Sequence, residues 1–205
     1  MAEIVIIHGY AGSGKSTQCT RIVRDGFRDF SIQHISAGNV LRGIRTGVTP
    51  SAFSDIINAP DAQYPLPEGI VSGVLFESIQ EDHLNVNPAL VLIDGYPRHP
   101  NAVELFRSEL RDRSHRLLGA IAMQVPMEVS VERLLLRGQR AGERVSSDTL
   151  ENFAIERYDL DRKTTNFAIE ALSKFVTVET VNAVGDVDSV YTNFRASLER
   201  LILKY

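Results

Sequence analysis

The stretch EIVIIHGYAGSGKSTQ (residues 3–18) joins a continuous apolar run to a loop rich in glycine. The run at 3–8 is mostly β-branched and carries only one charged residue, which is typical of a strand buried on both faces of a sheet. Residues 14–26 behind the loop have the pattern of a helix that ends near Gly26. A glycine-rich loop in this place lets successive backbone N–H groups converge at a helix N-terminus. The stretch therefore predicts an anion-binding loop.

The loop fits the pattern G-x-x-x-x-G-K-[ST], with Gly9, Gly14, Lys15 and Ser16 at its defining positions. Lys15 can reach the terminal phosphates of a nucleotide, and the hydroxyl of Ser16 or Thr17 can meet Mg²⁺. The alternative is a glycine-rich turn with an incidental lysine, and the strand–loop–helix order favours phosphate binding over it. The absence of an N-K-x-D element argues against a guanine-specific switch. The loop alone does not choose between a kinase, a GTPase, a motor and a sulfotransferase. We predict that nucleotide phosphates are bound by Gly12, Ser13, Gly14, Lys15, Ser16 and Thr17.

Strand and helix patterns alternate along the rest of the chain. Further strands are predicted at 32–36, 89–95, 117–125 and 175–181. Further helices are predicted at 39–46, 51–59, 67–82, 101–113, 127–138, 148–174 and 186–204. This alternation predicts an α/β fold of the P-loop NTPase type, with a parallel five-stranded sheet and helices on both faces. No repeat or linker interrupts the pattern, so residues 1–205 are expected to form one domain.

The composition excludes several kinds of site. The 205 residues carry a net charge of −4, which provides no overall attraction to nucleic acid or to a membrane surface. The one cysteine, Cys19, excludes an internal disulfide and a zinc site built from several cysteines, and it is expected to be a buried helix residue. The N-terminal run is too short for a membrane span and lacks the features of a signal peptide. We expect a cytoplasmic protein without zinc.

A second motif, DGYPR (residues 94–98), ends the strand predicted at 89–95. Ligands of parallel α/β sheets collect at the carboxyl ends of the strands, so Asp94 should lie beside the phosphate loop. A carboxylate there can hold Mg²⁺ through water, and Arg98 can clamp a phosphate. The alternative is an ordinary turn with a solvated arginine. Local sequence leaves both readings open.

The segments GYAGSGKSTQ (9–18), HISAGNVLR (34–42) and DGYPRHPNA (94–102), in this order, resemble the adenylate kinase family of nucleoside monophosphate kinases. The resemblance extends over nearly the whole chain, through RGQRAGERVSSDTLENFAIERY (137–158) and NAVGDVDSV (182–190). It implies reversible transfer of the terminal phosphoryl group from Mg-ATP to a nucleoside monophosphate, with AMP as the expected acceptor. It also implies a helical acceptor-binding segment at about 36–82, a short lid at about 138–148 and a monomer.

The resemblance also implies residue roles. Lys15 and the loop glycines would hold the donor phosphates, Asp94 would orient Mg²⁺, and the main chain near Gly185 would contact the adenine of ATP. The acceptor nucleotide would lie against Ser36, Ala37, Arg42, Gly95, Arg98 and Asn101. The groups acting on the transferring phosphoryl group would be Lys15, Asp94, Arg98, Arg137, Arg144 and Arg157. Phosphoryl transfer needs positioning and charge neutralisation rather than covalent chemistry from the protein, and arginine suits both.

The lid departs from the family pattern. Ser146 and Ser147 stand where members commonly carry paired aspartates, and the spacing from Arg144 to Arg157 is longer than usual. Arg140 is therefore an alternative to Arg144 in the lid. Arg133 shares a helix face with Arg137 and Arg140, and we predict that it is merely solvated. His8 is expected to be a core or supporting residue.

The residues expected to contact the acceptor base also depart from the family pattern. Family members that use AMP typically read STG where this chain has SAG, and they carry a glutamine a few residues after the DG(F/Y)PR motif. Ala37 and the shorter Asn101 resemble UMP/CMP kinases instead. An amide can pair with either kind of base, because it carries a donor and an acceptor. AMP remains our first expectation. The alternatives are a UMP/CMP kinase and a nucleotide-binding protein with weak catalysis.

Overall fold

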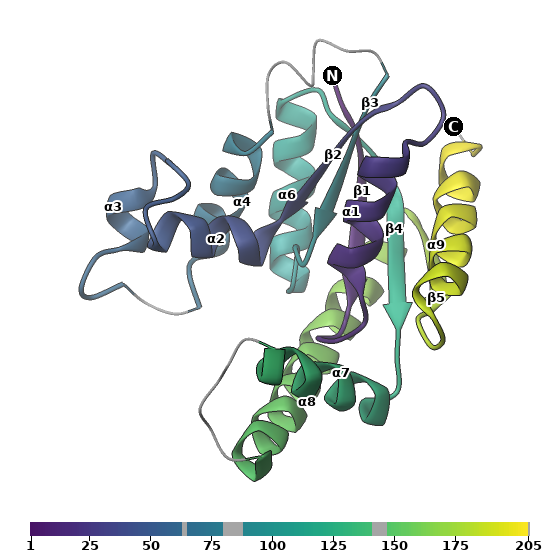
Figure 1. The fold of residues 1–205 in the computed structure, drawn as a ribbon. Coiled ribbons are helices and arrows are strands. Elements are labelled where there is room, and N and C mark those ends of the chain that lie inside the picture. Colours follow the sequence, from purple (N-terminus) through teal and green to yellow (C-terminus); the bar gives the residue numbers. More distant parts are fainter. Residues whose placement is uncertain (63–64, 80–87, 141–146, 205) are drawn as a thin grey trace.

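The structure, a computed structural model, describes residues 1–62, 65–79, 88–140 and 147–204. Within these ranges the strands form one five-stranded sheet in the order β2-β3-β1-β4-β5 (Figure 1). The strands are β1 (Glu3–Gly9), β2 (Ser31–Ser36), β3 (Ala89–Asp94), β4 (Arg116–Gln124) and β5 (Thr177–Asn182). All neighbouring pairs are parallel. The predicted fold class is confirmed.

The helices lie on both faces of this sheet and beyond its carboxyl edge. They are α1 (Lys15–Asp25), α2 (Ala37–Arg45), α3 (Ser54–Ile57), α4 (Glu68–Glu77), α6 (Pro100–Asp112), α7 (Met127–Arg140), α8 (Ser147–Ser173) and α9 (Val187–Ile202). Figure 1 shows α2, α3 and α4 together on one side of the sheet, and α7 beyond the end of β4. None of the described helices is both long and apolar enough to cross a bilayer.

Successive side chains of the central strand β1 point to opposite faces of the sheet, and each face carries an apolar layer. Ile4 and Ile6 point to the face covered by α6 and α8, where they meet Phe106 and Leu172. Val5 and Ile7 point to the opposite face. There the apolar layer is completed from α1 and α9, by residues that include Ile22, Phe194 and Leu198. Since both faces are covered, β1 is buried along nearly its whole length, as the apolar run predicts. Cys19 is buried in the second layer, as expected.

The helices α2, α3 and α4 have a small core of their own. Ile44, Ile57, Leu66 and Val74 pack together between α2, α3 and α4. The helix predicted at 51–59 is shorter than expected and begins only at Ser54. The reason is that Ser51 Oγ donates to Glu77 Oε2 at 2.5 Å and Ala52 N donates to Glu77 Oε1 at 2.8 Å, which holds these residues in a turn. The helix predicted at 67–82 ends at Glu77, and residues 80–82 lie outside the described ranges.

Candidate active site

The phosphate loop depends on two glycines for its shape. Gly12 and Gly14 have φ values of 75° and 83°, a region that residues with a Cβ rarely adopt. A Cβ on Gly12 would also lie 2.7 Å from the carbonyl oxygen of Ser130 on α7. The loop closes with a bond of 3.1 Å from Ser13 N to Tyr10 O, and α1 begins directly at Lys15. Backbone N–H groups therefore gather at a helix N-terminus, as phosphate binding requires.

Lys15 is folded back across this loop. Its Nζ donates to Gly9 O at 2.6 Å and to Tyr10 O at 3.1 Å. Burial lowers the pKa of Lys15, while the nearby carboxylates of Asp94 and Asp161 act in the opposite direction. The ammonium group is thus held against the backbone of the loop rather than in solvent.

Asp94 ends β3 between the ends of two neighbouring strands, since it pairs with Ile7 of β1 and with Ser36 of β2. Its Oδ2 accepts a hydrogen bond of 2.6 Å from Ser16 Oγ and lies 3.6 Å from His34 Nε2. Burial would raise the pKa of Asp94, but His34, Lys15 and Ser16 outweigh it and hold the pKa below its usual range. An ionised carboxylate and a hydroxyl side by side are oxygen ligands of the kind that Mg²⁺ prefers. The residues fit a magnesium site.

One cleft of about 360 Å³ collects most of the predicted site residues. The predicted residues that line it are Gly12, Gly14, Lys15, Ser16, Thr17, Ser36, Arg42, Asp94, Gly95, Arg98, Arg137 and Arg157. These residues come from the phosphate loop, the start of α2, the DGYPR segment, α7 and α8. A cleft lined mostly by cationic residues is suited to hold several phosphates at once.

A second cavity of about 400 Å³ adjoins the loop on the side of β5 and α9. Ser13 and Gly185 line this cavity, together with Gln18, Val187 and Val190. Gly185 lies in the turn between β5 and α9 at a φ of 114°. Thr17 lines both cavities, so the two cavities are adjacent.

The prediction that Arg133 is merely solvated is wrong. Its Nη1 donates to Gly12 O at 3.2 Å and its Nη2 donates to Gly185 O at 3.3 Å. The reason is that α7 packs against the phosphate loop, where Ser130 Oγ donates to Ala11 O at 2.5 Å. Arg133 follows Ser130 by three residues and so lies on the same face of α7. It lines both cavities.

Two predicted residues lie elsewhere, and a third is outside the described residues. Ala37 is buried at the start of α2, and Asn101 is exposed in the first turn of α6; neither lines the cleft. Arg144 lies outside the described residues, as does the side chain of Arg140. Most of the expected lid at 138–148 falls in the same undescribed stretch.

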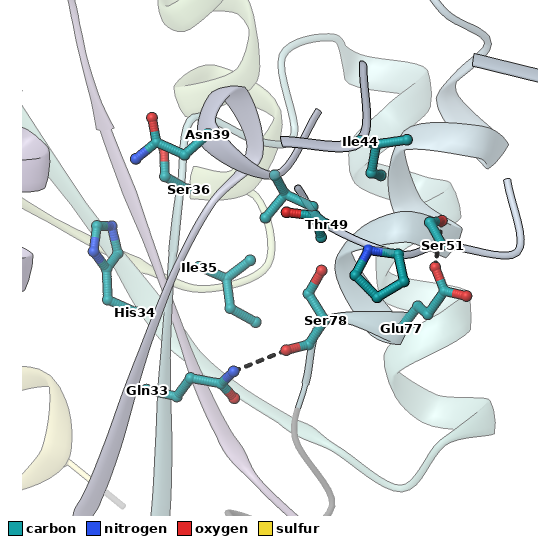
Figure 2. Close-up of a pocket in the computed structure, with 12 residues that line it drawn as sticks. Gln33, His34, Ile35, Ser36, Asn39, Ile44, Thr49, Ser51, Glu77 and Ser78 are labelled. Atoms are coloured by element: carbon teal, nitrogen blue, oxygen red, sulfur yellow. Dashed lines mark hydrogen bonds between the residues drawn. The ribbon is translucent and has the colours of Figure 1, made fainter. Parts of the chain in front are cut away.

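A third cavity, of about 400 Å³, lies against α2, and Figure 2 shows the residues that line it. Gly38 and Arg42 line the cleft, whereas Val40 and Ile44 line this third cavity. Its wall includes His34 at the edge strand β2, and Ser36 borders both spaces. The helix α2 therefore separates the cationic cleft from the third cavity.

Sequence reasoning missed Asp161, which the structure places inside the cleft. It accepts a hydrogen bond of 3.0 Å from Ala11 N and lies 3.3 Å from Arg98 Nη1 and 3.4 Å from Arg157 Nε. The spacing of four residues from Arg157 on a predicted helix was a signal that could have found this pair.

Comparison with known proteins gives a consistent family. A family model described as an AAA domain matches residues 8–153. An adenylate kinase of Deinococcus deserti is 30% identical, over 92% of this chain and 93% of the relative. A uridylate kinase of Saccharomyces cerevisiae is 28% identical, over 96% of this chain and 90% of the relative. A UMP-CMP kinase of Danio rerio is 28% identical, over 97% of each chain.

Proposed function

Because the chain belongs to the adenylate kinase family of nucleoside monophosphate kinases, we propose that it transfers the terminal phosphoryl group of ATP reversibly to AMP. The observation that carries the proposal is the cleft in which Arg42, Arg98 and Arg157 meet the phosphate loop. A cleft with cations on two sides of the loop can hold a donor and an acceptor phosphate in line.

On the donor side, the N–H groups of the loop and Lys15 would bind the phosphates of ATP. The side chains of Ser16 and Asp94 would hold Mg²⁺, directly or through water, and the ion would neutralise phosphate charge there. The adenine would enter the second cavity, where the main chain near Gly185 and the guanidinium of Arg133 lie together.

On the acceptor side, Arg42 and Arg98 would grip the phosphate of the monophosphate. The attacking phosphate oxygen is already anionic, so the reaction needs no general base. Arg137 and Arg157 would neutralise the charge that develops on the transferring phosphoryl group. We further propose that the segments around 36–82 and 138–148 close over both nucleotides and exclude water.

A pyrimidine monophosphate is the second candidate acceptor. Ala37 supports it, since this position offers no side-chain hydroxyl to a base, and relatives named for UMP and CMP are about as similar as those named for adenylate. AMP stays first because adenylate kinases recur among the similar relatives.

A coupled assay with ATP and each of AMP, CMP, UMP and GMP tests the proposal. We expect the highest kcat/KM with AMP, and Lys15→Ala, as the control, to be inactive with all four. A higher kcat/KM with UMP or CMP would establish the second candidate. No turnover with any acceptor would mean that the protein binds nucleotides without catalysing phosphoryl transfer. A monomer and a cytoplasmic location stay predictions, to be checked by light scattering and cell fractionation.

A further inference from the structure

Asp161 of α8 is a buried carboxylate, only 5% exposed, that the proposed mechanism leaves without a role. It meets Arg98, Arg157 and the N–H of Ala11 in the phosphate loop. We propose that Asp161 is a positioning residue, which orients Arg98 and Arg157 toward the phosphates and ties both to the loop. This inference rests on the proposed phosphoryl transfer, although not on the identity of the acceptor base.

The contacts of Asp161 use only one nitrogen of each guanidinium group. Arg98 approaches through Nη1 at 3.3 Å, and its Nε donates to Gly95 O at 2.9 Å. Arg157 approaches through Nε at 3.4 Å. In the part of the chain that the structure describes, Nη2 of Arg98 and both Nη groups of Arg157 have no protein partner. Each arginine is therefore held at one point while its outer nitrogens stay available to a phosphate.

The charges of the cleft explain why such an anchor is needed. The cationic residues that line it are Lys15, Arg42, Arg98, Arg133, Arg137 and Arg157. Like charges in a small space repel one another, and without nucleotides they would turn toward solvent. A buried carboxylate also costs free energy unless cations and donors compensate it. Asp161 and its two arginines meet both needs, which leaves the site organised before phosphates arrive.

The position of Asp161 is itself rigid. Tyr158 and Asn166, which flank it on α8, both contact Tyr10 of the phosphate loop. The rings of Tyr158 and Tyr10 lie 5.1 Å apart, and Tyr10 Oη donates to Asn166 Oδ1 at 3.0 Å. Tyr158 Oη also donates to Val125 O at 3.2 Å, at the end of β4. Asp161 thus lies between two contacts that hold α8 to the loop.

The test compares Asp161→Asn with Asp159→Asn, using the acceptor that the wild-type enzyme phosphorylates best. Asp159 is a matched control because it lies on α8 and, among the described residues, its ion pair is a surface contact of 3.7 Å with Arg162. We expect Asp161→Asn to lower kcat at least about tenfold while KM for ATP changes less than about twofold. Asp159→Asn should leave both within about twofold of the wild type.

A double variant separates positioning from a general structural effect. If Asp161 acts through the arginines, the loss of kcat caused by Asp161→Asn should be at least about threefold smaller in an Arg157→Ala background. Equal losses in both backgrounds would overturn the inference, as would a kcat within about twofold of the wild type for the single variant.

A measurement on the arginine itself does not require turnover. The NMR signal of the Arg157 Nε–H reports how fast this proton exchanges with water. In wild-type protein the exchange should be at least about tenfold slower than in Asp161→Asn protein. Asp159→Asn should keep the wild-type signal. Should Asp161→Asn fail to fold in a thermal melt, Asp161→Ser, which also removes the carboxylate, replaces it, and a wild-type Arg157 signal with wild-type kcat in that variant counts against the inference. Absence of transfer in the wild type would defeat the proposed function, whereas the arginine signal would still decide the role of Asp161.

Discussion

The hydroxyl of Ser16 donates a hydrogen bond of 2.6 Å to the carboxylate of Asp94, although 78 residues separate them in the chain. Ser16 lies in the first turn of α1 and Asp94 is the last residue of β3. The bond therefore joins the phosphate loop to the DGYPR segment at the carboxyl edge of the sheet. It also places two oxygen ligands where Mg²⁺ would accompany the donor phosphates.

Asp94→Asn tests this placement, because it keeps the size of the side chain and removes its charge. We expect kcat to fall about 100-fold and the Mg²⁺ concentration for half-maximal rate to rise, since one anionic ligand is lost. Initial rates measured over a Mg²⁺ titration check both. Asp29→Asn, at an exposed position, is the control. An unchanged Mg²⁺ dependence in Asp94→Asn would remove Asp94 from the metal site.

Lys15→Ala should lower kcat about 1000-fold, because the ammonium group over the loop is the charge best placed to follow the transferring phosphoryl group. Single-turnover rates at saturating nucleotide measure this loss. Lys163→Ala, which removes an exposed lysine of α8, should behave as the wild type. Near-normal kcat in Lys15→Ala would contradict the assignment.

Arg42→Ala should raise KM for the acceptor about tenfold or more while KM for ATP stays within about twofold, because Arg42 enters the cleft from α2, on the acceptor side. Steady-state kinetics with each nucleotide varied in turn separate the two. Arg45→Ala is the control, since Arg45 lies on the same helix but does not line the cleft. Equal rises in both KM values would mean that Arg42 was placed on the wrong side.

The sequence predicted the fold and the loop because both depend on local patterns. The apolar run before Gly9 is short and β-branched, which favours a doubly buried strand, and the motif around Lys15 needs no distant residue to be recognised. Asp94 could be placed because parallel strands bring their carboxyl ends to one edge.

The roles of Arg133 and Asp161 depend on tertiary packing, which periodicity does not contain. Helical spacing shows that Arg133 and Arg137 share a face, but not that this face lies on the phosphate loop. Likewise, Asp161 is polar at a position of α8 that is buried and in contact with the loop. A polar face directed into a ligand site and a solvated face look alike in sequence.

Arg133→Ala should raise KM for ATP about tenfold and leave KM for the acceptor within about twofold. The guanidinium joins Gly12 of the loop to Gly185 of the turn before α9, so its loss should loosen chiefly the cavity between these two residues. Calorimetric titration with ATP checks the donor side directly. Arg162→Ala, on the exposed side of α8, should bind ATP as the wild type does. If Arg133→Ala binds ATP with unchanged affinity, the bridge has no role in donor binding.

His8 is buried, and its Nε2 has no hydrogen-bond partner among the described residues. Burial, and then the charges of Lys15 and Arg98, lower its pKa from 6.5 to about 3. The native state therefore keeps this imidazole neutral, whereas the unfolded chain protonates it near its ordinary pKa. As the pH falls below 6.5, His8 binds a proton in the unfolded state but not in the native state, and the free energy of unfolding decreases.

Between pH 7 and pH 5 this single group should cost about 2 kcal/mol of stability, since each pH unit below the unfolded pKa is worth about 1.4 kcal/mol. His8→Leu removes the group. Between pH 7 and pH 5 its free energy of unfolding should therefore fall by about 2 kcal/mol less than that of the wild type. Urea unfolding of both proteins at pH 5, 6, 7 and 8 measures the difference. The other titratable groups are common to both proteins and largely cancel. Parallel pH profiles would show that His8 takes up its proton equally in the folded and unfolded states, against the burial that the structure gives it.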